Sequence, residues 1–148
     1  MAVVGSGPEL SAAFARRMVE LTAAMEWGGR MGLAAGGSLI HSEVKRIISQ
    51  PYPPASRPGE PPHQRRGEDG GLLGAYTWWP EGTDTVAVGA VGTDPDLQPV
   101  YLELGTSKME PRPHMRPAVA NMVAGPGGGQ VGAAFMHEVT RAIRRAIR

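Results

Sequence analysis

The sequence predicts an α+β fold in which a small antiparallel sheet packs with N-terminal and C-terminal helices. Near both ends of the chain, apolar residues recur at steps of three and four, the spacing of amphipathic helices. Between these segments, two short runs rich in Val, Thr and Trp are separated by a Gly-containing turn, as in a β-hairpin. A length of 148 residues indicates one domain, spanning residues 1–148.

Composition narrows the function classes. The chain has no cysteine, which removes disulfides, thiolate catalysis and cysteine-based zinc sites. Its formal net charge of +1 provides no global field for nucleic acid or an acidic substrate. No apolar run reaches membrane-spanning length, and the start MAVVGSG lacks the basic flank of a signal peptide. We therefore expect no membrane partner, and synthesis and use in a cytoplasm or in something assembled there.

Two helices are expected in the first fifty residues. Ser6 and Glu9 have capping-box spacing, and helix is expected from about Gly7 to Glu26. Gly28 and Gly29 predict a break or kink, after which helix resumes by about Gly36 and ends before Pro51. The apolar positions are Leu10, Phe14, Met18, Leu21 and Met25 in the first helix, and Ile40, Val44, Ile47 and Ile48 in the second.

Glycines in this region have two interpretations. Gly32, Gly36 and Gly37 either weaken the helix or allow another backbone to approach closely.

The segment Gln50–Gly71 is rich in proline, glycine and charges of both signs, which exclude regular structure. A loop this long is functional or a solvated linker. Under the functional interpretation it extends from the domain and docks on a neighbouring subunit or protein.

Three strands in meander order are expected next. They are Leu72–Trp79, Thr85–Val91 and Tyr101–Leu104, with turns at Pro80–Asp84 and Gly92–Pro99. Trp78 and Trp79 are adjacent in a strand and therefore point to opposite faces, one to the core and one to a loop, a helix or an interface.

The C-terminal part predicts a short helix over Pro117–Val123, a hinge at Gly125–Gly129 and a last helix over Val131–Arg148. An apolar stripe on the last helix faces a protein surface, and its basic side is either solvated or binds nucleic acid. The stripe consists of Phe135, Val139, Ile143 and Ile147, and the basic side of Arg141, Arg144, Arg145 and Arg148.

No motif indicates catalysis. The histidines His41, His63, His114 and His137 lack metal-ligand spacing, and the segment GPGGG lacks the lysine of a phosphate-binding loop. Glu103 is either a general base or, more simply, part of a structural ion pair. We expect no catalytic, cofactor-binding or metal-binding residues and no enzymatic activity.

The stretch Pro99–Val119 combines a strand, a turn at Gly105 and a helix start at Pro117, with Arg116 extended before it. Charges among apolar neighbours are costly unless paired, so Glu103 is predicted to form an ion pair with Arg112 or Arg116, within the same subunit or a neighbour.

This stretch resembles the tail-completion or head–tail joining proteins of long-tailed bacteriophages. Those proteins have a tyrosine-led strand ending in Glu-aromatic-Gly-Thr, then a Pro-rich turn and an Arg-Pro-Ala helix start. Leu104 and His114 depart from the pattern, where an aromatic residue and phenylalanine are common. The matching residues are Tyr101, Glu103, Gly105, Thr106, Pro111, Pro113, Arg116, Pro117 and Ala118.

A second segment shares the resemblance, which covers about Ile40–Val119. Its residues match a Ser-x-Pro-Gly-Glu-Pro-Pro pattern, and Gly71 or Gly70 with Leu72 loosely matches a Gly-x-Leu pattern before the first strand. The matching residues are Ser56, Pro58, Gly59, Glu60, Pro61 and Pro62.

The resemblance implies a structural protein of the phage neck, located in the virion, that joins the portal or connector of the head to the tail. It implies a homo-oligomeric ring, six-fold in the family, that contacts neighbouring connector and tail proteins while DNA passes through the lumen without sequence-specific binding. Two unlike faces would form the ring contact: the sheet with Trp78 or Trp79, and the helical side with the glycines. Arg112 belongs with the motif residues as a candidate interface or structural residue.

Two alternatives stay open from the sequence. One is a tail terminator or head-closure stopper of the same neck. The other is a nucleic-acid-binding module that uses the C-terminal arginines.

Overall fold

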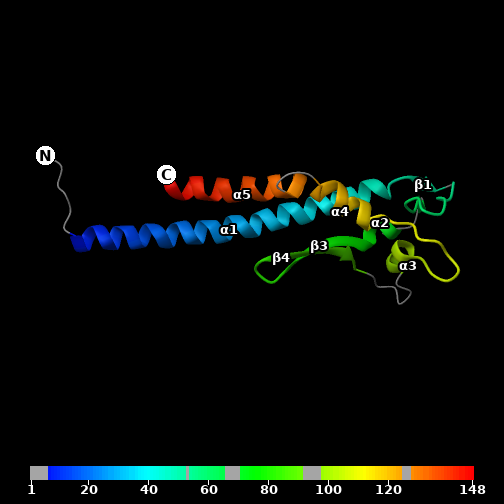
Figure 1. Cartoon of the computed structure of the whole chain (residues 1–148), viewed down its shortest axis with the longest axis horizontal. Helices are drawn as coiled ribbons and strands as arrows, with labels where there is room; N and C mark the ends of the chain where they lie inside the picture. The colour runs from blue at the N-terminus through cyan, green and yellow to red at the C-terminus, as the bar shows by residue number, and fades with distance from the viewer. Residues whose placement is uncertain (1–6, 53, 66–70, 92–97, 125–127) are drawn as a thin grey trace.

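The structure, a computed structural model, describes residues 7–52, 54–65, 71–91, 98–124 and 128–148 (Figure 1). It is 66% helix and 12% strand, so helices provide most of the packing surface and the α+β prediction is confirmed. The elements are α1 (Gly7–Ile47), β1 (Pro51–Tyr52), β2 (Gln64–Arg65), α2 (Gly71–Ala75), β3 (Tyr76–Glu81), β4 (Thr85–Ala90), α3 (Gln98–Leu104), α4 (Met115–Val123) and α5 (Gly129–Ile147).

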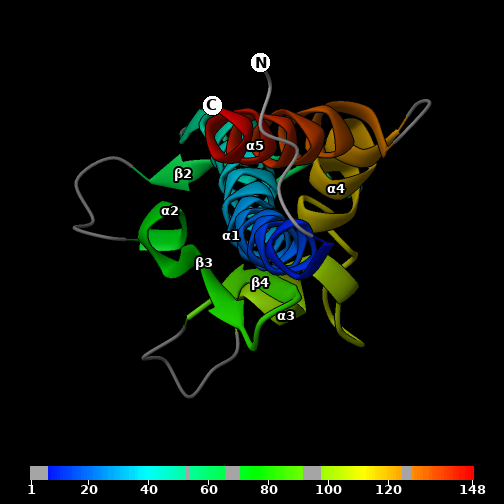
Figure 2. The same ribbon diagram turned by 90° about the vertical axis from the view of Figure 1, so that its left-hand side faces the viewer.

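Helix α1 is the axis of the molecule. Figure 2 looks along it, with α5 and α4 on one side and the β3–β4 hairpin on the other. Its 41 residues make a rod about 61 Å long at about 1.5 Å per residue. In Figure 1 the N-terminal part of α1 extends past the end of α5.

The predicted break at Gly28 and Gly29 is wrong, because α1 is continuous through both. The physical reason is the packing of α5. A Cβ added at Gly28 would lie 2.9 Å from Cβ of Ala142, and one at Gly32 would lie 2.6 Å from Cδ2 of Phe135. The glycines therefore let two helix backbones approach closely, and this packing offsets their low helix propensity. Of the two interpretations of the glycines, close approach is the correct one.

The β3–β4 hairpin packs on the other side of α1. Its strands are antiparallel, with Trp78 opposite Val88 in the register. A Cβ added at Gly37 would lie 2.6 Å from Cγ1 of Val86 and 3.5 Å from Cβ of Trp78, so this glycine admits the hairpin. Trp79 is 39% exposed and its ring covers Gly89 on the outer face. The prediction that the two tryptophans face opposite ways is confirmed.

The sheet is smaller than predicted. Residues 72–75 belong to helix α2, and β3 begins only at Tyr76. The predicted third strand Tyr101–Leu104 is wrong, because these residues form the last turn of α3. A run of four residues carries too little periodicity to separate strand from helix, and Pro99 suits the first turn of a helix. The predicted turn at Gly92–Pro99 lies mostly outside the described residues.

Residues Gln50–Gly71 contain one short parallel pair, in which Pro51 is opposite Gln64 and Tyr52 opposite Arg65. Residue 53 and residues 66–70 lie outside the described part of the chain.

The C-terminal helices are close to their predicted bounds. Helix α4 begins at Met115, two residues before the predicted start, so Arg116 is helical and not extended. Of the predicted hinge, residues 125–127 lie outside the described residues. Gly128 and Gly129 have φ of 83° and 58°, and a Cβ at Gly129 would lie only 2.3 Å from the carbonyl oxygen of Ala124. A non-glycine residue would be strained there.

The core lies at the C-terminal end of α1. The buried side chains of Val44 and Ile48 meet Tyr76 of β3 and Ala118 of α4. The opposite end of α1 is bare, with Phe14 68% exposed and Met18 46% exposed. Burial is therefore concentrated where α1, α4 and β3 converge.

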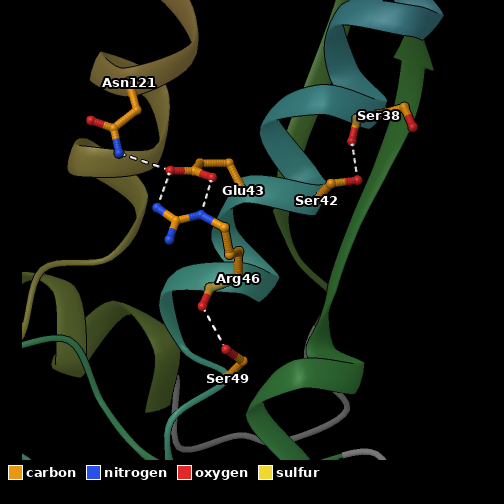
Figure 3. A network of polar contacts seen from close by, with 6 residues as sticks. All are labelled: Ser38, Ser42, Glu43, Arg46, Ser49 and Asn121. Carbon is orange, nitrogen blue, oxygen red and sulfur yellow. Dashed lines mark hydrogen bonds and ion pairs between the residues drawn. The ribbon is translucent and has the colours of Figure 1, made fainter.

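A polar network joins α1 to α4 beside this core (Figure 3). The buried carboxylate of Glu43 accepts hydrogen bonds from Nε of Arg46 at 2.6 Å and from Nδ2 of Asn121 at 2.8 Å. The hydrogen bond from Arg46 lowers the pKa of Glu43 most, followed by the bond from Asn121, while burial acts to raise it. Together the two bonds lower this pKa from 4.5 to about 2. The ionised carboxylate is thus part of the folded structure.

Within the described residues, no helix is both long enough and apolar enough to span a membrane.

Candidate functional site

The two segments that carry the resemblance meet in space, although their contacting residues Ser56 and Arg112 are 56 positions apart in the sequence. We call this region the motif corner: residues 56–62 together with residues 101–118. The guanidinium of Arg112 donates from Nη1 to both the carbonyl oxygen and the hydroxyl of Ser56. The backbone nitrogen of Gly59 donates to the carbonyl oxygen of Pro111 at 3.0 Å. Ser56 is only 5% exposed, so the loop is fixed to its own chain.

This arrangement corrects the expectation that the loop extends away from the domain. Within residues 54–63, Ser56 and Pro62 are buried. This part of the loop contacts residues 111 and 112 of the same chain. Pro58, Gly59 and Glu60 remain exposed at the tip, where the Glu60 carboxylate accepts the backbone N–H of Arg57 at 2.9 Å. Among the described residues of the loop, Pro54, Ala55 and Arg57 are exposed as well, so this side of the loop can meet a neighbouring molecule.

Glu103 holds the start of α4. Its Oε2 accepts the backbone N–H groups of His114 at 2.7 Å and Met115 at 2.9 Å, and its Oε1 accepts that of Arg116 at 3.0 Å. Pro117, the next residue, has no N–H. The start of a helix leaves its first backbone N–H groups without an intrahelical partner. In α4 three of these groups donate to the Glu103 carboxylate, and the position of the fourth is Pro117, which has none.

Within one chain, the predicted ion pair between Glu103 and Arg112 or Arg116 is therefore wrong; a pair with an arginine of a neighbouring subunit stays a prediction. Arg112 binds Ser56, and Arg116 meets Glu103 through its backbone while its side chain is exposed. Burial acts to raise the pKa of Glu103, but three backbone hydrogen bonds together outweigh it and lower the pKa. A negative charge at a helix N-terminus is also favoured by the helix dipole.

His114 is the centre of the motif corner and is fully buried. Its Nε2 is hydrogen-bonded to the hydroxyl of Tyr76, and its Nδ1 lies 3.0 Å from the carbonyl oxygen of Arg112. A neutral imidazole that donates from Nδ1 and accepts at Nε2 satisfies both contacts. Burial, followed by the nearby Glu103 carboxylate, raises the pKa of Tyr76, so its hydroxyl stays protonated and donates.

The two departures from the family pattern have structural counterparts. His114 stands where the pattern has phenylalanine and is fully buried, and its imidazole is hydrogen-bonded to the hydroxyl of Tyr76. Leu104 is 56% exposed, so an aromatic residue is not needed there to fill a core.

A tight turn connects α3 to this region. Gly105 has φ of 77°, and a Cβ there would lie 2.9 Å from the carbonyl oxygen of Met109. Its backbone nitrogen donates to Tyr101 at 2.8 Å and closes the helix, the role of a C-terminal glycine. Thr106 then pairs with Met109 through their backbones. The prediction that Gly105 marks a turn is confirmed, although it ends a helix and not a strand.

Within the motif corner, the Glu103 carboxylate is occupied by backbone donors and the side chain of His114 is fully buried. Among the described residues, no three His, Asp or Glu side chains are grouped so that they could hold a metal ion. The arrangement can instead hold three chain segments in one rigid geometry.

Exposed apolar residues surround the motif corner on α3. Val100, Tyr101 and Leu104 are each more than 40% exposed, and they lie within about one turn of the helix. Tyr101, a motif residue, is therefore outside the core and presents its ring to the surface. Such patches on a small chain mark contact surfaces.

Comparison of the chain with known protein families, with curated proteins and with solved structures finds no match.

Sequence reasoning missed two contacts of the site. It did not find that Tyr76 and His114 form a buried pair, or that Ser56 anchors Arg112. The replacement of a common phenylalanine by His114 was a usable signal, because a buried imidazole needs a partner. Ser56 is a motif residue, but nothing in the sequence indicated its contact with Arg112, because the two residues are far apart in the chain.

Proposed function

We propose that the protein is a structural component of a bacteriophage neck that joins the DNA-filled head to the tail. The supporting observation is that both motif segments of the resemblance fold into one motif corner, fixed by the Arg112–Ser56 and Glu103–α4 hydrogen bonds. A purely accidental match would give no reason for distant motif residues to contact one another. The rigid corner suits a connector, which must hold its shape while it bears on other proteins.

The exposed half of α1 supports assembly with other chains. Phe14, Met18, Leu21 and Met25 recur at steps of four and three, and the series continues into Gly28 and Gly32. Helix α5 covers this face at the glycines. Beyond the end of α5, Phe14 and Met18 are 68% and 46% exposed, so the same apolar face continues uncovered. We define this uncovered part, Phe14 to Met25, as the α1 seam.

The working form we propose is a homo-oligomeric ring. The glycines expected to contact a neighbour are already covered, Gly32 and Gly36 by α5 and Gly37 by the β3–β4 hairpin, so the ring contact needs other surfaces. Two unlike apolar surfaces remain, the α1 seam and the Val100–Leu104 face of α3, at opposite ends of the molecule (Figure 1). Contact between one surface and the other on the next copy is heterologous, and it forms a ring when the rotation closes.

Complementation tests this function. The gene is deleted from the genome that carries it, and variants are supplied in trans. Without the protein we expect DNA-filled heads and free tails that are not joined. The double variant Phe14→Ser with Met18→Ser should keep its free energy of unfolding, because both side chains are exposed, and should fail to restore joining.

Val19→Ser is the matched control, because Val19 is 70% exposed on another side of the same helix. It should restore joined particles. Joined, infectious particles in the complete absence of the protein would contradict the proposal. A tail terminator or head-closure stopper would instead give tails of abnormal length or heads that lose DNA, so the particle defect also separates these neck roles.

A further inference from the structure

We infer that the outward face of α5 binds the phosphate backbone of duplex DNA without reading sequence; this inference rests on the proposed neck function. The face consists of four exposed arginines on the last turns of the helix, with His137 one turn earlier: Arg141, Arg144, Arg145 and Arg148.

The helix is docked, which fixes the direction of this face. Phe135 meets Gly32, and Val139 and Ala142 meet Gly28, so the apolar side of α5 lies against α1. The arginines follow at positions turned away from these contacts, and all four are exposed. The packing of α5 on α1 therefore keeps the arginines on the outer side of the molecule. Because the helix is already ordered, binding a ligand does not require it to fold.

Few carboxylates among the described residues neutralise this charge. Arg141 forms an ion pair with Glu138 at 2.6 Å. For Arg144, Arg145 and Arg148, the contacts within the described residues include no ion pair with a carboxylate. An open depression of about 500 Å³ lies on this face; its lining includes the four arginines, His137 and Thr140, and no Asp or Glu side chain. Cations without counterions attract a polyanion.

The residue type and spacing favour phosphates. All four cations are arginines, whose planar fork can donate two parallel hydrogen bonds to one phosphate. From Arg141 to Arg148 the helix rises about 10 Å, and one DNA strand offers a phosphate about every 3.4 Å of its axis. The face can therefore reach about three phosphates.

A membrane surface fits less well. A helix that lies on a membrane needs a free apolar face beside its basic one. On α5 the apolar face is occupied by α1 at Phe135, Val139 and Ala142. The exposed large apolar residues among its described positions are Met136, in the middle of the helix, and Ile147, at its C-terminal end, too few to form a continuous face.

The test is a fluorescence anisotropy titration of a short labelled DNA duplex with the full chain at several salt concentrations. We expect binding at low salt. The logarithm of the binding constant should fall linearly with the logarithm of salt concentration, with a slope of roughly −3 for three phosphates at about −0.9 each. A duplex of unrelated sequence should bind equally well. The variant Arg144→Gln/Arg145→Gln/Arg148→Gln should bind at least tenfold more weakly and lose most of the slope.

A charge-matched control removes three exposed arginines elsewhere, as Arg16→Gln/Arg30→Gln/Arg57→Gln, and should retain most of the affinity. Equal loss in both variants would show an effect of net charge alone and overturn the inference. Binding to vesicles of anionic lipid without binding to DNA would overturn it as well. A chain that joins heads to tails without binding DNA would remove this inference and leave the neck function standing; DNA binding by a chain not needed for joining would do the reverse.

Discussion

The carboxylate of Glu103 lies 3.0 Å from the backbone nitrogen of Arg116 and accepts its N–H, completing the cap on α4. The side chain comes from the end of one helix and closes the start of another. His114, just before α4, donates its backbone N–H to Glu103 of α3, and its side chain is hydrogen-bonded to Tyr76 of β3. His114 therefore links α3, α4 and β3.

Replacing Glu103 should destabilise the protein. Glu103→Gln keeps one acceptor oxygen but loses the charge and part of the cap, so the free energy of unfolding should fall by roughly 1–3 kcal/mol. Urea denaturation followed by circular dichroism measures this. The control is Glu110→Gln, an exposed residue in the neighbouring turn, which should change stability little. Equal stability of the Glu103 variant and the wild type would contradict the capping role.

The Tyr76–His114 pair should behave as a unit. His114→Phe leaves the buried Tyr76 hydroxyl without its acceptor, and we expect a loss of about 1–3 kcal/mol in the free energy of unfolding. Adding Tyr76→Phe removes the stranded hydroxyl and should recover part of this loss. A double-mutant cycle measures the coupling. Additive effects of the two changes would show that the hydroxyl and the imidazole do not depend on each other.

Two glycines one turn apart on α1 should respond with opposite signs to alanine. A Cβ at Gly32 would lie 2.6 Å from the Phe135 side chain, so Gly32→Ala should destabilise by about 1–3 kcal/mol through overpacking. A Cβ at Gly29 would have no neighbour within 4 Å, so Gly29→Ala should stabilise by roughly 0.5–1 kcal/mol through helix propensity. Thermal and urea unfolding of both variants measure the pair; a gain in stability for Gly32→Ala would contradict the close packing of α1 on α5.

Acid should weaken the fold through Glu43 and Glu103. Both pKa values are lowered in the folded protein, that of Glu43 from 4.5 to about 2. A carboxyl group whose pKa is lower in the folded protein stabilises the fold at pH values above its pKa in the unfolded chain. This stabilisation is lost as the pH falls through its pKa in the folded protein. The free energy of unfolding should therefore decline between about pH 4.5 and 2. Glu43→Gln should be less stable at neutral pH and depend less on pH in this window; curves parallel to the wild type would contradict the account.

The sequence predicted those features that depend on local patterns. The apolar steps of α1 and α5, the hairpin and the alternation of Trp78 and Trp79 all follow from periods within a few residues. Gly105 was recognisable because a turn there requires positive φ.

Features that depend on distant contacts were not predicted. In an isolated segment Gly28 would favour a break in the helix. In the structure α1 is continuous there, because Gly28 packs against Ala142, a residue more than one hundred positions later in the chain. The charge of Glu103 indicated an arginine partner, but backbone N–H groups satisfy it, and every residue except proline has one. Residue types cannot reveal which backbone groups lack partners before the helix ends are known.

The most direct test of the central claim is a reconstruction by electron microscopy of the neck of particles that contain this chain. The account predicts density for several copies around the axis between portal and tail, with the exposed half of α1 of one copy in contact with the next. A particle in which the chain is absent from the neck, or is present as a single copy without contact between copies, would contradict it.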